Sequence, residues 1–448
     1  MGTYIPGTKE EQMEMLEAVG LKDPEELFSE IPEELRIQGL AELPAGLSEM
    51  EVIRRMEELA SKNRIFRTVF RGAGAYRHYI PAVVKKIASR EEFTAVYTPY
   101  QPEINQGILQ ALFEYQTMIC GLTGMDVSNN SMYDGASASA EALLMCRDKK
   151  RQALFVSETA DPKVLAVIRQ YCGGRNVPVR LIPAKDGVTD LEALEKILRE
   201  AAEKGDAPAG VYFQSPNYEG LIEPAAACCQ VIHEAGALAV MNVNPISLGI
   251  LQPPGELGAD IAVGEGQPLG NELAYGGPYF GFLAARRELM RRMPGKIVGQ
   301  TEDAQGRRAF ALTLQAREQH VRRERAGSNI CTNQAHCAVR AGIYLSAMGP
   351  GGLRETASQC MAKAHYFCGL LEEAGLRRKH SGEFFHEFVT VCDEELAMAI
   401  LRTLEDNGIL GGLPLGRGEI LWCVTEMNTR EEMEQAAVLI RKAAETWN

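Results

Sequence analysis

Short apolar runs alternate with stretches of helical periodicity between residues 106 and 241, and this alternation restricts the fold more than any other feature of the sequence. A run such as Ala153-Leu-Phe-Val156 is typical of a strand that is buried on both faces. Strands that alternate with helices of this length form mostly parallel sheets covered on both sides. The sequence therefore predicts an α/β fold, with strands at 153–156, 179–182, 210–213 and 237–241 and helices at 106–122, 136–147, 162–172, 191–203 and 224–234.

The segments on either side of this alternation have a different character. Before it, Thr8-Lys-Glu-Glu11 and Ser48-Glu-Met-Glu51 match the capping box that begins a helix. After it, Gly349-Pro-Gly-Gly352 separates two expected helices, near 332–347 and at 353–374. Two expected strands, around 384–391 and 420–424, and a terminal helix follow. We therefore expect a helical segment at 1–105, a large α/β domain at 106–330 and a small α+β domain at 331–448.

Composition and charge exclude several classes of protein. The formal net charge is −13, which disfavours nucleic acid or an anionic membrane surface as the partner. No apolar run is long enough to span a membrane, and no signal peptide is apparent. The 11 cysteines are scattered without a Cys-x-x-Cys pair, which favours a cytoplasmic location. The histidines lack metal-binding spacing, so we expect no metal site. No dinucleotide fingerprint is present, so we do not expect a dehydrogenase that binds a dinucleotide cofactor.

The strongest local motif is Asp134-Gly-Ala-Ser-Ala-Ser-Ala-Glu141, at the start of an expected helix. Gly135 lets the backbone approach an anion, and Ser137 and Ser139 add hydroxyl donors to the unpaired N–H groups of the helix start. A tight turn followed by an alanine-rich helix packed on the sheet explains the same residues equally well. The motif therefore predicts an anion cup without deciding between these two explanations.

Two further polar clusters exceed what packing requires. The first, Tyr97 to Glu103, includes the hydroxyls of Tyr97 and Tyr100 and the amide of Gln101. The second is a basic run that ends in a Ser-Asn loop, a pattern that favours a clamp for a phosphate or a carboxylate. Its members of interest are Arg317, His320, Arg323, Ser328 and Asn329.

The order of these features resembles that of pyridoxal-phosphate (PLP) enzymes of the aspartate aminotransferase type, fold type I. In that family a lysine after the later strands binds PLP as a Schiff base, and an aspartate holds the pyridine nitrogen. This chain has no lysine between Lys204 and Lys296, and Asn242 stands where the aspartate is expected. Gln267 is the best candidate for the lysine position. Such a chain is an enzyme with an unusual base, an inactive paralogue, or half of an enzyme whose lysine lies on another chain.

Three longer motifs resemble one family, the glycine cleavage system P-protein. They are Gly72-Ala-Gly-Ala-Tyr-Arg-His-Tyr-Ile-Pro81, Tyr97-Thr-Pro-Tyr-Gln-Pro-Glu103, and the block from Leu314 to Thr332. The length and the missing lysine match subunit 1 of those P-proteins that are divided into two chains. One departure is Arg325-Ala-Gly327, where the family usually has Lys-Ala-Thr.

The resemblance implies a subunit of PLP-dependent glycine dehydrogenase (decarboxylating). In that family glycine loses CO2 and the aminomethyl group passes to the lipoyl arm of H-protein. It implies an α2β2 assembly with subunit 2, which carries the lysine and binds PLP covalently. Gly135, Ser137, Ser139, Asn242 and Gln267 then form a degenerate cup in this chain. By the same analogy, Arg317 and His320 are catalytic candidates, and Tyr97, Tyr100, Gln101, Arg323, Ser328 and Asn329 line the shared site.

Two alternatives remain open at the level of sequence. A self-sufficient PLP enzyme would use a lysine outside the gap, such as Lys296. A scaffold or regulatory protein would keep the PLP fold without a catalytic role.

Overall fold

The computed structural model describes residues 7–36, 44–96 and 98–447. Two compact units are distinguished, Met1–Ile65 and Phe66–Asn448. The first contains α1 (Lys9–Ala18), η1 (Pro24–Phe28), η2 (Glu33–Leu35) and α2 (Glu49–Ala60). Both predicted capping boxes are confirmed, since Thr8 and Ser48 each exchange hydrogen bonds with the glutamate three residues later.

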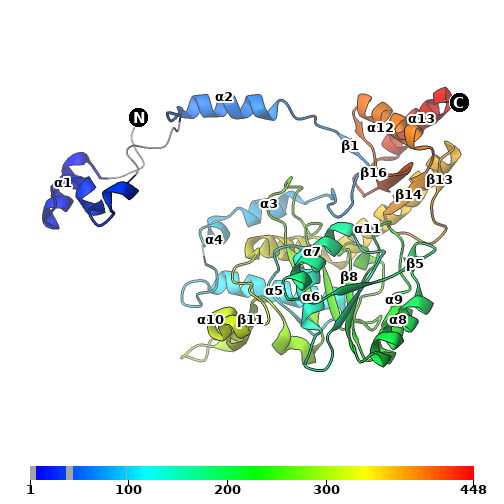
Figure 1. Cartoon of the computed structure of the whole chain (residues 1–448). Helices are drawn as coiled ribbons and strands as arrows, with labels where there is room; N and C mark the ends of the chain where they lie inside the picture. The colour runs from blue at the N-terminus through cyan, green and yellow to red at the C-terminus, as the bar shows by residue number, and fades with distance from the viewer. Residues whose placement is uncertain (1–6, 37–43, 97, 448) are drawn as a thin grey trace. The chain divides into compact units, whose positions relative to one another are not determined.

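A seven-stranded sheet forms the centre of the second unit (Figure 1). Its order is β2 (Val127–Ser128), β10 (Gly281–Ala285), β9 (Ile261–Glu265), β8 (Leu238–Asn242), β7 (Pro208–Gln214), β3 (Ala153–Ser157) and β4 (Val179–Ile182). The five strands from β9 to β4 are parallel, whereas β10 runs antiparallel to both of its neighbours. The predicted mostly parallel sheet is therefore confirmed.

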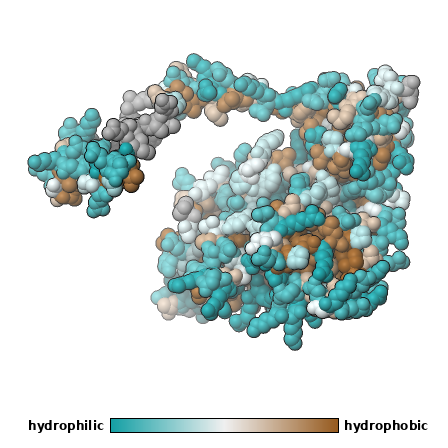
Figure 2. All heavy atoms as spheres, viewed as in Figure 1, coloured by the Kyte–Doolittle hydropathy of each residue, from teal (hydrophilic) through white to brown (hydrophobic). Residues whose placement is uncertain are grey.

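Successive strand residues point to opposite sides of this sheet, and in its central strands both sets are buried. Helices therefore cover both faces. Phe155 and Phe213 pack in one core cluster with α5 (Gln106–Thr123), α8 (Leu191–Glu203) and α9 (Ala225–Glu234). Val156 and Tyr212 pack in another with α6 (Gly135–Met145) and α7 (Pro162–Gly173). Figure 2 shows polar side chains over most of the visible face, with an apolar area near α7 and β8.

A smaller antiparallel sheet lies near the carboxyl end of the chain. Its order is β13 (Arg377–Arg378), β14 (Glu387–Val391), β17 (Glu419–Cys423) and β16 (Leu413–Gly416), and α12 (Glu394–Asp406) and α13 (Arg430–Trp447) pack against it. Phe367 of α11 (Ala335–Glu373) stacks on Phe70 and meets Trp422 edge to face. The strand β1 (Thr68–Val69) pairs with β15 (Ile409–Leu410), so the chain before the large sheet is joined to this smaller core.

Shorter elements complete the second unit. They are α3 (Ala82–Ala88), α4 (Glu91–Thr94), β5 (Ala184–Lys185), β6 (Val188–Thr189), η3 (Ser247–Gly249), η4 (Arg287–Arg292), β11 (Ile297–Glu302), β12 (Arg308–Thr313), η5 (Gln315–Arg317), α10 (Gln319–Arg322) and η6 (Arg323–Arg325). Among the described residues, no helix combines the length and the apolar composition that crossing a bilayer requires. The division at residues 105 and 330 stays a proposal.

The structure corrects several expected boundaries. The glycine-rich segment 264–277 predicts a loop from Gly264, but Gly264 lies inside β9, because its flanking residues pair with β8 and β10. The strand expected from Phe384 begins at Glu387, while Phe384 itself forms an isolated bridge with Leu221. The break expected at Gly349-Pro-Gly-Gly352 is confirmed as a kink between two helices at Gly349, whose φ is 58°, but it is narrower than expected because Gly349 is the non-helical residue within α11.

The loop after β7 is locked against the smaller sheet at Gly220. Its φ is +92°, and a Cβ placed there would lie 1.8 Å from the carbonyl oxygen of Glu387. We therefore expect Gly220→Ala to lower the free energy of unfolding by about 2–4 kcal/mol, through backbone strain and overpacking. Chemical denaturation measures the change. Gly107→Ala is the matched control, since a Cβ at Gly107 of α5 meets nothing within 4 Å; equal stability of the two variants would contradict this account.

Candidate functional site

The carboxyl ends of β7, β8 and β9 meet the start of α6 at one edge of the central sheet. Parallel strands place their carboxyl ends together, and ligands of open α/β sheets bind there. Gln214, Asn242 and Glu265 end these three strands, and with Gly135 they line a cavity of about 320 Å³. The loop after β7 and the segment around Tyr76 also reach this cavity. We call it the sheet-edge cavity.

The anion cup at the start of α6 is filled by carboxyl groups of the chain itself. Gly135 donates its N–H to Glu265 Oε2 at 2.9 Å, and Ser137 donates its N–H to Asp134 Oδ1 at 2.7 Å. A Cβ on Gly135 would lie 2.6 Å from the backbone nitrogen of Glu265, so only glycine permits this approach. Two of the helix-start donors are thereby used internally.

The other members of the predicted cup are also engaged in packing. Ser139 donates its hydroxyl to the carbonyl oxygen of Gly135 at 2.7 Å and accepts a hydrogen bond from Asn242 Nδ2 at 3.2 Å. Gln267 is buried, and its side chain binds both backbone groups of Tyr76 at 2.9 Å. The residue expected in the lysine position therefore ties the segment around Tyr76 to the sheet.

Acidic groups dominate the ionisable lining of the sheet-edge cavity. Four carboxyl groups and one lysine line it: Asp134, Asp161, Glu265, Glu387 and Lys163. The ammonium group of Lys163 is bound to the carbonyl oxygen of Ala73 and lies 3.5 Å from Asp161. Burial raises the pKa of Glu265 to about 8 and that of Glu387 to about 7. Burial, and then the charge of His78, hold the pKa of His386 well below its usual value, so this imidazole is neutral.

These observations test whether PLP fits the sheet-edge cavity. The cofactor carries a phosphate dianion, and the cup that would bind it is occupied by Glu265 and capped by Asp134. Asn242 supplies no negative charge for a pyridinium, and Gln267 cannot bind the aldehyde. The residues of this cavity do not fit PLP.

A second polar group lies around the basic run. Lys296 Nζ and Glu318 Oε2 form a buried ion pair at 2.5 Å, and Lys296 lies over the ring of Tyr100 at 5.2 Å. The Tyr100 hydroxyl donates to Asn333, whose Nδ2 donates to Asn130 Oδ1 at 2.6 Å. The structure thus joins two clusters that are separate in the sequence. Lys296 does not line the sheet-edge cavity, which argues against the lysine alternative.

The remaining predicted residues belong to the loop of residues 317–329 or to the segment 97–103. Arg317 donates both terminal nitrogens to the carbonyl oxygens of Met293 and Gly295, and His320 lies 3.6 Å from Glu318. Ser328 donates its hydroxyl to Glu141 Oε1 at 3.1 Å. Gln101, Arg323 and Asn329 are exposed, and Tyr97 lies outside the described residues. Of the residues in this group that the structure describes, none lines the sheet-edge cavity, so the described predicted residues fall into two places.

The sequence prediction missed Glu265, Glu387, Glu318, Asn130 and Asn333, and it named Lys296 only as the lysine of an alternative. The sequence Gly264-Glu-Gly266 is typical of an exposed turn, and nothing in it signals that the carboxyl group is buried. Lys296 and Glu318 are separated by the β11–β12 hairpin, so their pairing depends on the fold.

The buried carboxyl group of Glu265 predicts a pH dependence of stability. Because its folded pKa of about 8 exceeds its ordinary value of 4.5, the folded state keeps a proton that the unfolded state loses. The free energy of unfolding should therefore fall as pH rises from about 4.5 to 8, at up to about 1.4 kcal/mol per pH unit from this group. Glu265→Gln should flatten this fall in denaturation curves at pH 5 and pH 8. The exposed Glu203→Gln is the control, and an unchanged slope in E265Q would contradict the assignment.

The ion pair of Lys296 and Glu318 predicts strong coupling between the two side chains. Lys296→Met leaves a buried carboxylate without its partner, which costs about 3–5 kcal/mol. The double variant K296M/E318Q should recover part of this loss. A double-mutant cycle in urea measures the coupling, and additive single-variant effects would rule it out.

The comparisons with known proteins agree with one another. The family model of the glycine cleavage system P-protein matches residues 2–440. A relative from Moorella thermoacetica, named probable glycine dehydrogenase (decarboxylating) subunit 1, is 50% identical over 98% of this chain and 99% of its own length. A relative of the same name from Geobacillus thermodenitrificans is 47% identical over 96% of this chain and 97% of its own.

Solved structures agree with the sequence comparisons. A glycine decarboxylase (P-protein) of the glycine cleavage system, in an inhibitor-bound form, is 40% identical, with a TM-score of 0.91 over 99% of this chain and 100% of its own. Mouse CSAD, at 17% identity and a TM-score of 0.69 over 94% and 92% of the two chains, shares the fold. The predicted fold type I architecture is thereby confirmed. The chain belongs to the glycine cleavage system P-protein family.

Proposed function

We propose that this chain is the subunit without the Schiff-base lysine in a two-chain glycine decarboxylase, and that a companion subunit binds PLP. The relatives are named subunit 1, which implies a second subunit. The observation that carries the proposal is Gln267, which stands where the lysine is expected and is held by the backbone of Tyr76. The internal carboxyl groups in the anion cup support the same conclusion.

The loop around residues 317–329 is the part of this chain that we assign to the shared site, with Tyr97, Tyr100 and Gln101. Arg317 is bound to two carbonyl oxygens, so its role is to fix the loop against the turn at Met293 to Gly295. The exposed guanidinium of Arg323 is the better group to bind the carboxylate of glycine. Ser328 and Asn329 orient the substrate, and His320, half-exposed beside Glu318, moves a proton.

The proposed partners follow from these assignments. Glycine is the substrate, PLP supplies an electron sink when bound by the companion, and the lipoyl arm of H-protein accepts the aminomethyl group. An α2β2 assembly brings the loop of this chain to the cofactor of its companion. This chain alone then has no decarboxylase activity.

Exchange of labelled bicarbonate into glycine tests the proposal. We expect no exchange with either chain alone and measurable exchange when this chain and its companion are combined with PLP and H-protein. His320→Ala should lower the exchange rate about 100-fold, as loss of a proton-transfer group does. His233→Ala, at an exposed position of α9, is the control. Exchange by the companion alone, or an unchanged rate in H320A, would favour a scaffold role for this chain.

A further inference from the structure

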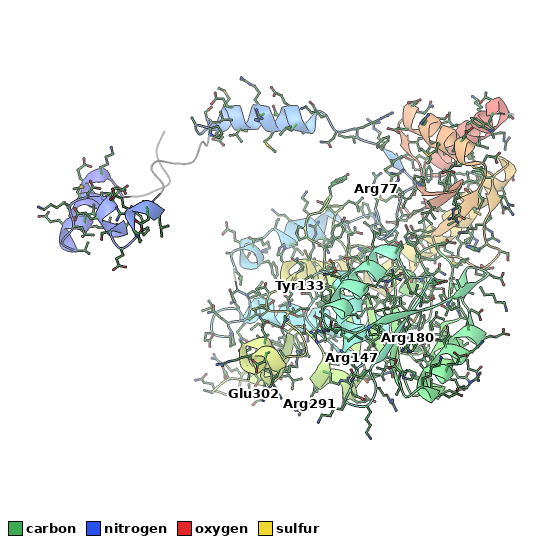
Figure 3. All side chains as sticks on the ribbon, in the orientation of Figure 1. Arg77, Tyr133, Arg147, Arg180, Arg291 and Glu302 are labelled. Atoms are coloured by element: carbon green, nitrogen blue, oxygen red, sulfur yellow. The ribbon has the colours of Figure 1, made fainter. Side chains whose placement is uncertain are left out.

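A strongly basic pocket lies beside the loop of residues 317–328. This pocket, which we call the arginine pocket, has a volume of about 580 Å³ and is lined by eight arginine or lysine side chains and three carboxyl groups. The whole chain has a net charge of −13, so the charge of this pocket is opposite in sign to the net charge of the chain. Arg147 and Arg291, labelled in Figure 3, come from segments far apart in the sequence and meet here.

The positive charges of the arginine pocket are only partly neutralised within the chain, since its eight basic side chains face three carboxyl groups. Six of its arginines form no ion pair in the described ranges 7–36, 44–96 and 98–447. They are Arg147, Arg175, Arg291, Arg292, Arg317 and Arg322. Their recorded partners are neutral: Arg175 donates to the carbonyl oxygen of Gly327, and Arg292 to that of Arg147. Of the three carboxyl groups, Glu318 is paired with Lys296 and Glu141 accepts the hydroxyl of Ser328. The pocket therefore has an unmatched positive charge.

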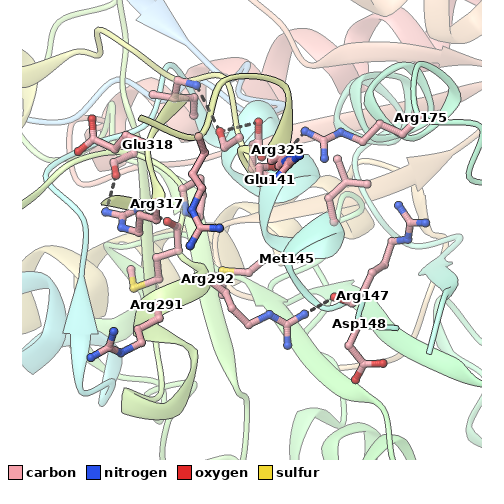
Figure 4. A pocket seen from close by; sticks show the side chains of 18 of the residues that line it. Glu141, Met145, Arg147, Asp148, Arg175, Arg291, Arg292, Arg317, Glu318 and Arg325 are labelled. Atoms are coloured by element: carbon pink, nitrogen blue, oxygen red, sulfur yellow. Dashed lines mark hydrogen bonds between the residues drawn. The ribbon is translucent and has the colours of Figure 1, made fainter. Parts of the chain in front are cut away.

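The arrangement of the guanidinium groups indicates the size of the missing anion. Figure 4 shows Arg175, Arg325, Arg317, Arg292, Arg147 and Arg291 spread along the pocket and pointing in different directions. A single small anion would require donors that converge on one point. Charges spread in this way fit several carboxylates at separate positions, as on the surface of an acidic protein.

The charge of the arginine pocket also indicates whether its partner binds transiently or permanently. Cores of permanent subunit interfaces are apolar and depleted in charged residues. Complementary charges mainly accelerate association and suit a partner that must arrive and leave at each turnover. Within the proposed function, the lipoyl carrier is such a partner, whereas the companion subunit is permanent.

We propose that the arginine pocket docks an acidic face of the lipoyl carrier protein. This inference rests on the proposed function, since it assumes that the chain works with a carrier. Arg291 and Arg292 of η4 are exposed and lie outside the residues that we assign to the shared site, which makes them suitable for a test. The prediction is that docking weakens without them while the reacting site stays intact.

The experiment uses the complete two-chain enzyme with two alternative acceptors, the lipoylated carrier and free lipoamide. R291A/R292A should raise the KM for the carrier about tenfold and reduce its dependence on salt, because rim charges set electrostatic attraction. The rate with free lipoamide should not change. The matched control is R354A/R402A, which removes two exposed arginines from α11 and α12.

Three other outcomes overturn the inference, each in a different way. An unchanged KM for the carrier means that the pocket does not dock it. An equal loss with free lipoamide places the pocket in the reacting site, and loss of the companion in size-exclusion chromatography makes it the subunit interface. A charge-reversed acidic residue on the carrier that restores binding to R291E/R292E would support it further. Absence of exchange with either acceptor in the unaltered enzyme would instead refute the proposed function.

Discussion

The parallel pairing of β9, β8, β7 and β3 is the constraint on which the rest of the structure depends. It brings the ends of three strands and the start of α6 to one edge, which is where enzymes of this fold bind their cofactor. In this chain the same edge is closed by Glu265 and Gln267. The architecture of a cofactor site is therefore kept, while its chemistry is replaced by internal hydrogen bonds.

The two polar regions of the molecule differ in their ionisable side chains. The sheet-edge cavity is lined mainly by carboxyl groups, and burial raises the pKa of two of them. The region around Arg317 is rich in unpaired arginines. In the first region, carboxyl groups of the chain itself occupy two of the donors at the start of α6, whereas the arginines of the second region attract the carboxylates of an acidic partner. This separation supports the proposed division of labour, in which a companion chain binds the cofactor.

Much of the fold could be predicted from the sequence because its signals are local. The capping boxes at Thr8 and Ser48 and the apolar strand at 153–156 depend on neighbouring residues alone. The start of α6 lies where the sequence predicted that a helix begins, but the carboxyl group of Glu265 that is bound there was not predicted. Glu265 lies 130 positions away and reaches Gly135 only through the pairing of β9 in the sheet. Long-range contacts of this kind decide the chemistry of a site, and a local motif does not contain them.

The central claim is that the cofactor belongs to the companion chain. Borohydride reduction of the assembled enzyme with PLP fixes the cofactor to the lysine that holds it, and mass spectrometry of the separated chains identifies that lysine. The account predicts a pyridoxyl group on the companion and none on this chain. A pyridoxyl group on Lys163, the lysine that lines the sheet-edge cavity, or on Lys296 would contradict it.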